Sequence, residues 1–144
     1  RDALAGAGLP LREDYVRRGA ADYSFKSGFD SARGLLELPE RPTALLCISD
    51  MLALGAIASA KEMGLRVPED VTVVGFDDVE HTTMFHPYVT TVAQPCAEIG
   101  RKAMELLESA IAHTPVSRET LLPHRLIVRE SSATPTGPVG LKSR

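Results

Sequence analysis

The sequence predicts an α/β domain built around a parallel sheet, and three features between Ala44 and Gln94 carry that prediction. Residues 44–48 and 71–76 are short apolar runs rich in branched side chains, which favours strands over helices. Neither run alternates apolar with polar residues, a pattern typical of strands buried on both faces of a parallel sheet. The segment Met51–Met63 between them is long enough to be the helix of a βαβ crossover, which should be right-handed.

The elements before this unit continue the alternation of helix and strand. Residues 1–8 have the pattern of the last turns of a helix that is stopped by a glycine. A weaker strand is predicted at 15–21, at a sheet edge because it contains two adjacent arginines. A helix with Ser24 as its N-cap is predicted over 25–38. This alternation is typical of the α/β class. Because the chain does not open on Met, we expect it to be part of a longer protein.

After the central unit, the sequence predicts two short strands, one helix and a tail. Short strands are predicted at 89–92 and 125–128 from their branched apolar residues. Residues 97–112 between them should form an amphipathic helix, and its apolar stripe requires a covering surface. The stripe consists of Ile99, Ala103, Leu106, Leu107, Ala110 and Ile111. Residues 132–144 show no apolar periodicity and are expected to be a disordered tail.

The central helix Met51–Met63 is apolar nearly all round, which indicates burial on more than one side. One side covers the sheet. A second subunit is the natural cover for the other side, because Gly55, Ala56, Ala58 and Ala60 would let a partner approach closely. The alternative is that the helix lies between two layers of its own domain, since inward burial is the default for apolar residues.

Both apolar strands of the central unit end in polar residues that could bind a ligand. Ser49 and Asp50 follow the first strand, and Asp77 and Asp78 follow the second. Ligands of open parallel sheets bind beyond the carboxyl ends of the strands. Asp77, the first residue after its strand, is the best candidate for such a contact. Asp50 could instead cap the following helix, and Asp78 could be a turn residue.

Composition excludes several classes of function for these residues. The chain has 144 residues, enough for one domain with a core, and a formal net charge of −3. Its 16 Lys and Arg are scattered, which argues against a nucleic-acid surface. Two distant cysteines make no disulfide framework, and Cys47 is expected to be a small buried hydrophobe. No apolar run approaches a membrane span, and no signal peptide is visible.

Motifs for catalysis and for cofactor binding are missing from the sequence. There is no metalloprotease or P-loop pattern, no Cys-x-x-Cys pair and no nucleophile with a base beside it. The four histidines have no partners at zinc-ligand spacing. We therefore expect neither an enzyme, nor a cofactor, nor a metal site.

Taken together, four segments are similar to a known family. The runs PTALLCISDMLALGAIASAKEMGLRVPEDVTVVGFDD, PYVTTVAQP, EIGRKAMELL and LLPHRLIVRES follow one another in an order and spacing that resemble the effector-binding region of LacI/GalR transcriptional regulators. The resemblance covers residues 1–131. It implies a two-lobed fold like that of periplasmic sugar-binding proteins, with three chain crossings between the lobes.

On this resemblance the chain is most of the second lobe with a remnant of the first. Residues 9–92 and 125–129 would belong to the second lobe, and 95–121 to the first. The DNA-binding head and the rest of the first lobe would precede residue 1. The resemblance implies a cytoplasmic repressor that senses a small polar effector, a sugar or sugar derivative, and that contacts operator DNA through the absent head. The alternative is a periplasmic sugar-binding protein of a transporter.

The resemblance also implies roles for individual residues. Asp77 corresponds to an acidic residue that holds ligand hydroxyls, and Tyr23 to an aromatic residue that stacks on the ligand. Gln94 corresponds to a polar contact at a crossing, and Asp50 to the Asp after the strand. Ser49 stands where Asn is common, so the effector could differ. Tyr23 could equally be an ordinary rim aromatic, and Gln94 an ordinary turn residue.

The family forms homodimers through the helix corresponding to Met51–Met63 and through the segment around residues 84–85. On this chain the interface residues would be Met51, Leu54, Ala58, Met84 and Phe85.

Overall fold

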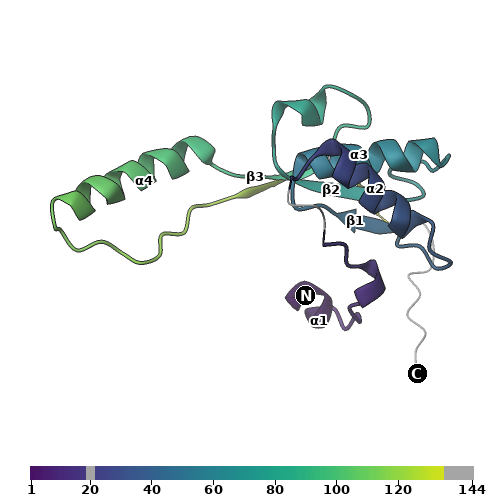
Figure 1. Cartoon of the computed structure of the whole chain (residues 1–144), viewed down its shortest axis with the longest axis horizontal. Coiled ribbons are helices and arrows are strands. Elements are labelled where there is room, and N and C mark those ends of the chain that lie inside the picture. The colour runs from purple at the N-terminus through teal and green to yellow at the C-terminus, as the bar shows by residue number, and fades with distance from the viewer. Residues whose placement is uncertain (19–21, 135–144) are drawn as a thin grey trace.

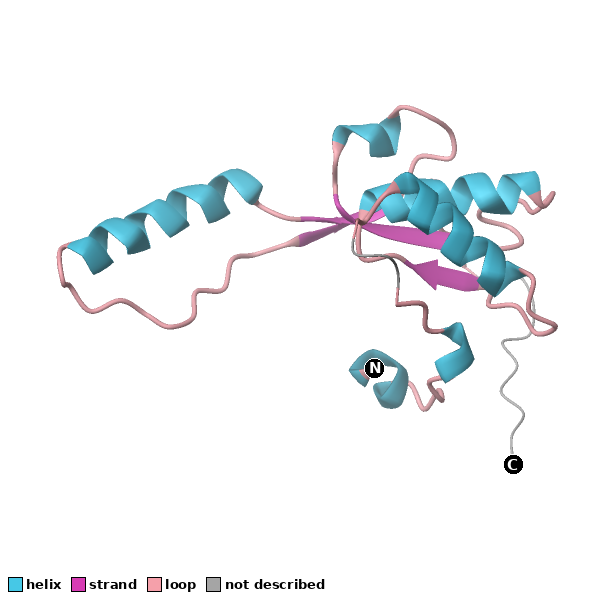
Figure 2. Cartoon of the chain, in the orientation of Figure 1, coloured by secondary structure: helices cyan, strands magenta, loops and turns pink. Residues whose placement is uncertain are grey.

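A four-stranded sheet forms the centre of the protein, with α2 and α3 on one of its faces (Figures 1 and 2). The computed structural model describes residues 1–18 and 22–134. The elements in chain order are α1 (Asp2–Gly6), the 3-10 helix η1 (Glu13–Tyr15), α2 (Phe25–Leu36), β1 (Ala44–Leu46), α3 (Asp50–Glu62), β2 (Thr72–Asp77), the 3-10 helix η2 (Glu80–Thr83), β3 (Thr90–Ala93), α4 (Cys96–Ile111) and β4 (Arg125–Ile127).

The strands lie in the order β1-β2-β3-β4, and the first three are parallel. Leu45 pairs with Val73, and Val74 with Thr90, so the predicted βαβ unit is present. β4 runs antiparallel to β3, with Val92 opposite Leu126. The predicted α/β class with a mostly parallel sheet is therefore confirmed.

α2 packs directly on α3, and two glycines allow the close approach. A Cβ placed on Gly55 would lie 2.1 Å from the Phe25 carbonyl oxygen, and one on Gly28 would lie 2.3 Å from the Leu52 carbonyl oxygen. α2 therefore covers one side of α3, and the sheet covers another. The expectation that Gly55 makes room for a second subunit is corrected, since the chain supplies this cover itself and the alternative of two layers within one domain holds for that side.

The second face of the sheet is open among the described residues, which corrects the expectation that the strands are buried on both faces. Leu45 and Val73 face α2 and α3 and are buried. Leu46 and Leu126 lie on the opposite face, and Leu46 is 80% exposed. Both faces of these strands are apolar, so the sequence carries no alternation that could show which face is covered.

The predicted strand at 15–21 is not observed where the structure describes it. Glu13–Tyr15 form a 3-10 turn, and no strand follows through residue 18; residues 19–21 lie outside the described part. Side-chain contacts hold the segment instead of a strand ladder. The Tyr15 hydroxyl donates to the Glu40 carbonyl at 2.6 Å, and the Arg12 guanidinium lies 4.2 Å from the centre of the Tyr15 ring.

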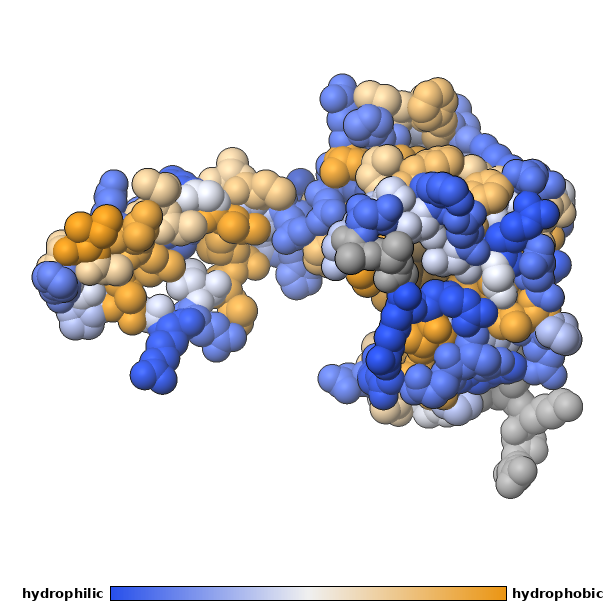
Figure 3. Space-filling view, in the orientation of Figure 1, coloured by the Kyte–Doolittle hydropathy of each residue, from blue (hydrophilic) through white to orange (hydrophobic). Residues whose placement is uncertain are grey.

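α4 and the segment that returns from it project away from the sheet as a long arm (Figure 1). No residue of α4 is buried, and Ile111 of the apolar stripe is 70% exposed. Apolar side chains gather along this arm in Figure 3. Between α4 and the returning segment lies an open groove of about 550 Å³, which begins at Phe76 and Val92 on the open face of the sheet. The stripe's covering surface is thus not supplied by the described residues.

The structure describes the first three residues, 132–134, of the segment that was predicted to be a disordered tail. The Ser131 side chain is buried, and the Ser132 hydroxyl lies 2.7 Å from that of Thr90. The rest of the predicted tail, residues 135–144, lies outside the described part. None of the described helices is both long enough and apolar enough to cross a membrane.

Candidate functional site

The candidate ligand residues gather at the edge of the sheet where the parallel strands end. α2 and α3 run in the same direction, because Gly28 lies beside Leu52 near their first turns and Arg33 pairs with Glu62 near their last turns at 3.0 Å. Both helices therefore begin at the carboxyl ends of the strands. This places Tyr23 before α2, Ser49 before α3, Asp77 at the end of β2 and Gln94 after β3 on one side of the lobe. These are the predicted site residues other than Asp50.

Asp77 and Gln94 are in direct contact. The Gln94 side-chain nitrogen donates to the Asp77 carboxylate at 2.6 Å, and both residues are half-buried. Asp77 is also a non-glycine residue at a φ of 113°, a costly conformation that surrounding contacts must maintain. A carboxylate and a carboxamide side by side offer acceptors and donors to ligand hydroxyls, and bonds to the charged partner are the stronger ones.

Tyr23 stands at the rim of the same edge with its side chain 53% exposed. Its φ of 47° lies in the left-handed region, and the residues around it hold the turn. Asp22 accepts hydrogen bonds from the Ser27 hydroxyl at 2.6 Å and from the Ser24 amide at 3.2 Å. These bonds, that to Ser27 foremost, lower the pKa of Asp22. Ser24 caps α2 as predicted by accepting from the Ser27 amide. These contacts hold the segment that carries the exposed Tyr23 ring.

Ser49 caps α3, and Asp50, for which the cap was predicted, is buried. The Ser49 hydroxyl accepts from the Leu52 amide at 3.3 Å, so Ser49 caps α3, and the alternative of Asp50 as the cap is wrong. Asp50 is 1% exposed. Its two carboxylate oxygens accept from the Thr91 hydroxyl at 2.6 Å and the Val79 amide at 2.9 Å. Burial raises the pKa of Asp50 against the opposing effect of these bonds. Asp50 therefore faces the interior of the lobe.

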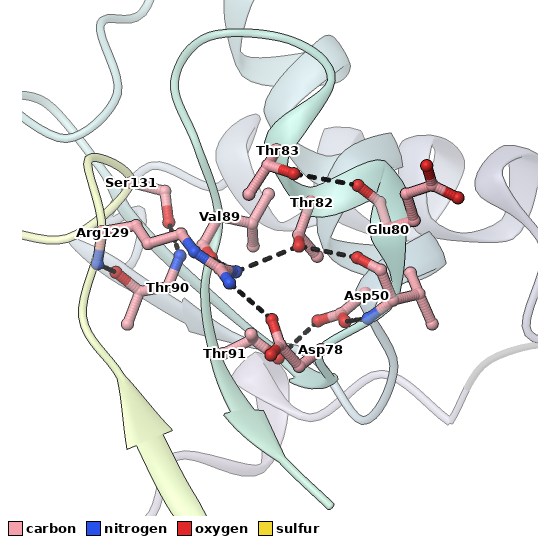
Figure 4. Close-up of polar contacts among 11 residues, drawn as sticks. Asp50, Asp78, Glu80, Thr82, Thr83, Val89, Thr90, Thr91, Arg129 and Ser131 are labelled. Atoms are coloured by element: carbon pink, nitrogen blue, oxygen red, sulfur yellow. Dashed lines mark hydrogen bonds and ion pairs between the residues drawn. The ribbon is translucent and has the colours of Figure 1, made fainter.

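A polar cluster behind the edge was not anticipated from the sequence (Figure 4). Arg129 binds the Asp78 carboxylate at 2.6 Å, the Thr82 hydroxyl at 3.0 Å and the Val89 carbonyl at 2.9 Å. Asp78 directly follows β2 and has a φ of 60°, in the left-handed region. No local pattern could identify the pair, because 51 positions separate its members. The one available signal is that Arg129 directly follows an apolar strand, where an unpaired charge would be costly.

The predicted dimer residues lie on α3 and on the loop after η2. Met51, Leu54 and Ala58 are half-buried, and Met84 and Phe85 are exposed, Phe85 by 71%. The Lys61 ammonium donates to the His86 carbonyl at 2.5 Å, which ties the loop after η2 to the end of α3. Among residues 1–18 and 22–134 there is no cluster of His, Cys, Asp and Glu that could hold a metal ion.

Comparison with known proteins identifies the family to which this chain belongs. The family of periplasmic binding protein-like domains matches residues 1–132. The chain belongs to this family. Within it, the chain is 43% identical over 131 residues to the HTH-type transcriptional repressor CytR of Escherichia coli K12, covering 90% of this chain and 38% of that repressor. The chain thus spans well under half the length of the curated relatives it matches.

Solved structures of family members have the same fold. A regulatory protein of the LacI family from Chloroflexus aggregans superimposes with a TM-score of 0.81 at 36% identity, over 92% of this chain and 47% of that one. The transcriptional regulator CelR, solved as a cellobiose complex, superimposes with a TM-score of 0.82 at 36% identity, over 92% of this chain and 40% of that one. The predicted relationship to the LacI/GalR regulators is confirmed.

Proposed function

We propose that this chain is the effector-sensing part of a cytoplasmic transcriptional repressor, and that its ligand is a sugar or sugar derivative held at the edge formed by Tyr23, Asp77 and Gln94. The observation that carries the proposal is the contact between Asp77 and Gln94 at the carboxyl ends of parallel strands. Ligands of open α/β sheets bind at this position. Support comes from the relatives, which are transcriptional repressors and include a regulator solved with cellobiose.

The chemistry of the edge suits a polyhydroxylated ring. One oxygen of the Asp77 carboxylate accepts from Gln94, and its second oxygen carries no hydrogen bond to the described residues. That oxygen can accept from a ligand hydroxyl in a charge-assisted bond. Tyr23 can cover one face of the ring, since aromatic side chains combine a large apolar surface with a polar tip. Ser49 presents a shorter side chain than the Asn common in the family, which leaves more room beside α3.

The ligand site would be completed by groups from a second lobe, and ligand binding would change how the two lobes close. Closure would alter the affinity of a DNA-binding head for its operator. A coupling free energy of about 1–3 kcal/mol is sufficient for such control. The rival function, a solute-binding protein of a transporter, has less support, because the relatives named above are transcriptional regulators.

The same proposal includes a homodimer. Met51, Leu54 and Ala58 are half-buried on α3, and Met84 and Phe85 are exposed on the loop after η2, which contacts α3. Exposed apolar side chains on two neighbouring elements are typical of an interaction surface. The operator-binding unit would thus contain two copies of the lobe.

Calorimetric titration of the full-length protein with cellobiose tests the ligand class and the site together. We expect binding by the wild type and a loss of at least about tenfold in affinity for Asp77→Ala, since a hydrogen bond to a charged group contributes about 1.5–3 kcal/mol. Binding to the operator without ligand should remain. Asp30→Ala, which removes an exposed carboxylate from α2, is the matched control and should bind cellobiose normally.

Two results would count against the proposal. Wild-type affinity of Asp77→Ala for cellobiose would remove Asp77 from the site. Failure of the wild type to bind cellobiose or its constituent monosaccharide, glucose, would remove these sugars as ligands and would favour another polar effector.

A further inference from the structure

We propose that Arg129 is a positioning residue for the ligand site, which acts by holding the Asp77–Asp78 turn in the conformation that presents the Asp77 carboxylate. Arg129 lies just after β4 and does not belong to the edge itself. The inference rests on the proposed function for its ligand, but the arrangement of the turn is a property of the chain alone.

The turn needs external support because of its backbone. Asp77 and Asp78 are consecutive non-glycine residues with φ values of 113° and 60°. Both values lie where a Cβ crowds the backbone, and such residues persist only when their surroundings hold them there. Without those contacts the two residues would relax towards ordinary conformations. The Asp77 side chain would then leave Gln94.

Two anchors act immediately after Asp77, and they come from different elements. The first is Arg129, which binds the Asp78 carboxylate at 2.6 Å. The second is Asp50 at the start of α3, whose carboxylate accepts from the Val79 amide at 2.9 Å. The turn is therefore fixed through the side chain of one residue and the backbone of the next, as the close-up in Figure 4 shows for Asp50, Asp78 and Arg129.

The geometry of Arg129 makes it a rigid anchor. One guanidinium nitrogen binds Asp78, and the other donates to the Thr82 hydroxyl at 3.0 Å and to the Val89 carbonyl at 2.9 Å. Its own amide donates to the Thr90 hydroxyl at 2.8 Å. The side chains of Arg129 and Asp78 are 18% and 27% exposed, so solvent screens the pair less than it screens a surface ion pair. A lysine ammonium is a single point of charge and cannot reproduce this fork.

The test compares Arg129→Gln, Arg129→Lys and Asp78→Asn in the full-length protein, with Arg66→Gln as control. Arg66 binds Asp70 with two guanidinium nitrogens in the loop before β2, at the opposite edge of the sheet from Asp77. Cellobiose affinity is measured by calorimetry well below the unfolding temperature, and amide hydrogen exchange is measured at Val79. Asp78→Asn keeps the shape of the side chain and the tolerance of positive φ, so it guards against a failure of Arg129→Gln to fold.

We expect Arg129→Gln and Asp78→Asn each to weaken cellobiose binding on the order of tenfold and to speed exchange at Val79, with no further loss in the double variant because the two residues act as a unit. Arg129→Lys should recover thermal stability but not affinity. Arg66→Gln should change neither affinity nor exchange. Additive losses in the double variant, or full rescue by Arg129→Lys, would overturn the positioning role.

Failure of the inference and failure of the proposed function give different results. Normal cellobiose affinity and normal Val79 exchange in Arg129→Gln, beside a lower unfolding temperature, would make Arg129 merely structural. If cellobiose does not bind the wild type, cellobiose is not the ligand and Val79 exchange alone decides. Faster exchange in Arg129→Gln then supports the anchoring of the turn, and unchanged exchange refutes it.

Discussion

Replacing Gly28 with alanine should push α2 away from α3 and destabilise the lobe. A Cβ at Gly28 would lie 2.3 Å from the carbonyl oxygen of Leu52, 2.6 Å from its Cα and 2.8 Å from its carbonyl carbon. All three are backbone atoms of α3, so no side chain can turn aside to make room. The helices would have to separate, although both supply side chains to the same buried core, Ala32 from α2 and Ile57 from α3. Overpacking of this kind costs about 1–3 kcal/mol.

Gly34→Ala in the same helix provides the matched control. The nearest atom to a Cβ at Gly34 is the Arg17 Nε at 3.9 Å, which is an ordinary contact. Both substitutions gain about 1 kcal/mol of helix propensity, so Gly34→Ala should stabilise the protein by up to about that amount. Because the gain is common to both, the difference between the two variants isolates the clash. We expect that difference to be about 2–3 kcal/mol, near the upper end for overpacking, since only backbone can yield.

The difference can be measured by urea unfolding followed by far-UV circular dichroism, with midpoints and slopes fitted for both variants. Equal stability of Gly28→Ala and Gly34→Ala would refute the close packing of α2 on α3. The clash should also reach the ligand site, because α2 begins just after Tyr23 and a shift of the helix would carry that ring away from Asp77. If the proposed ligand site is correct, Gly28→Ala should therefore show weaker binding of a cellobiose probe than Gly34→Ala.

Two further predictions concern the proposed interface and the cysteines. Leu54→Lys should abolish self-association, because an unpaired ammonium in an apolar contact costs several kcal/mol. Sedimentation velocity measures the self-association, and Glu69→Lys at an exposed loop position is the control. A wild type that is monomeric at high concentration would contradict the interface. Burial raises the pKa of the Cys47 thiol to about 12, so at pH 8 it stays protonated, and thiolate forms only as the pH approaches that value. Iodoacetamide at pH 8 should therefore label the exposed Cys96 much faster than the half-buried Cys47 in the native protein, as peptide mass spectrometry would show; equal labelling rates would contradict the raised pKa of Cys47.

Local patterns predict most of the elements, because their causes are local. The stop at the end of α3 illustrates this: Gly64 takes a φ of 74°, which residues with a Cβ rarely adopt, and the Leu65 amide bonds back to Ala60 at 2.9 Å. Ser24 satisfies the first turn of α2 from within the same turn. The rule that parallel strands end at one edge was enough to select Asp77, whereas Tyr23 and Gln94 were selected through the family resemblance. The contact between Asp77 and Gln94 follows from the register of β2 and β3, which pairs Asp77 with Ala93.

What the sequence could not predict depends on partners far along the chain. The pattern of α3 shows that two of its sides are covered, but it does not say whether α2 or another molecule is the cover. The strand expected at 15–21 illustrates the same limit, because a strand exists only where a neighbour offers a ladder. In the described part of that segment, the Tyr15 hydroxyl and the Arg17 guanidinium instead donate hydrogen bonds to nearby backbone carbonyl oxygens.

Asp50 and Gly75 together show how such a long-range feature can still be inferred. A Cβ at Gly75 would lie 2.2 Å from an Asp50 carboxylate oxygen, so β2 lacks a side chain at the place where α3 brings this carboxylate against the sheet. The space lets Asp50 reach Thr91 on β3 and the amide of Val79 beyond β2. Glycine in the middle of an apolar strand otherwise costs stability, so its presence indicates a close approach by another group. An aspartate at the start of the preceding helix is the nearest candidate. Considered as a pair, the two residues predict a buried structural carboxylate at Asp50, and they leave Asp77 as the carboxylate available to a ligand.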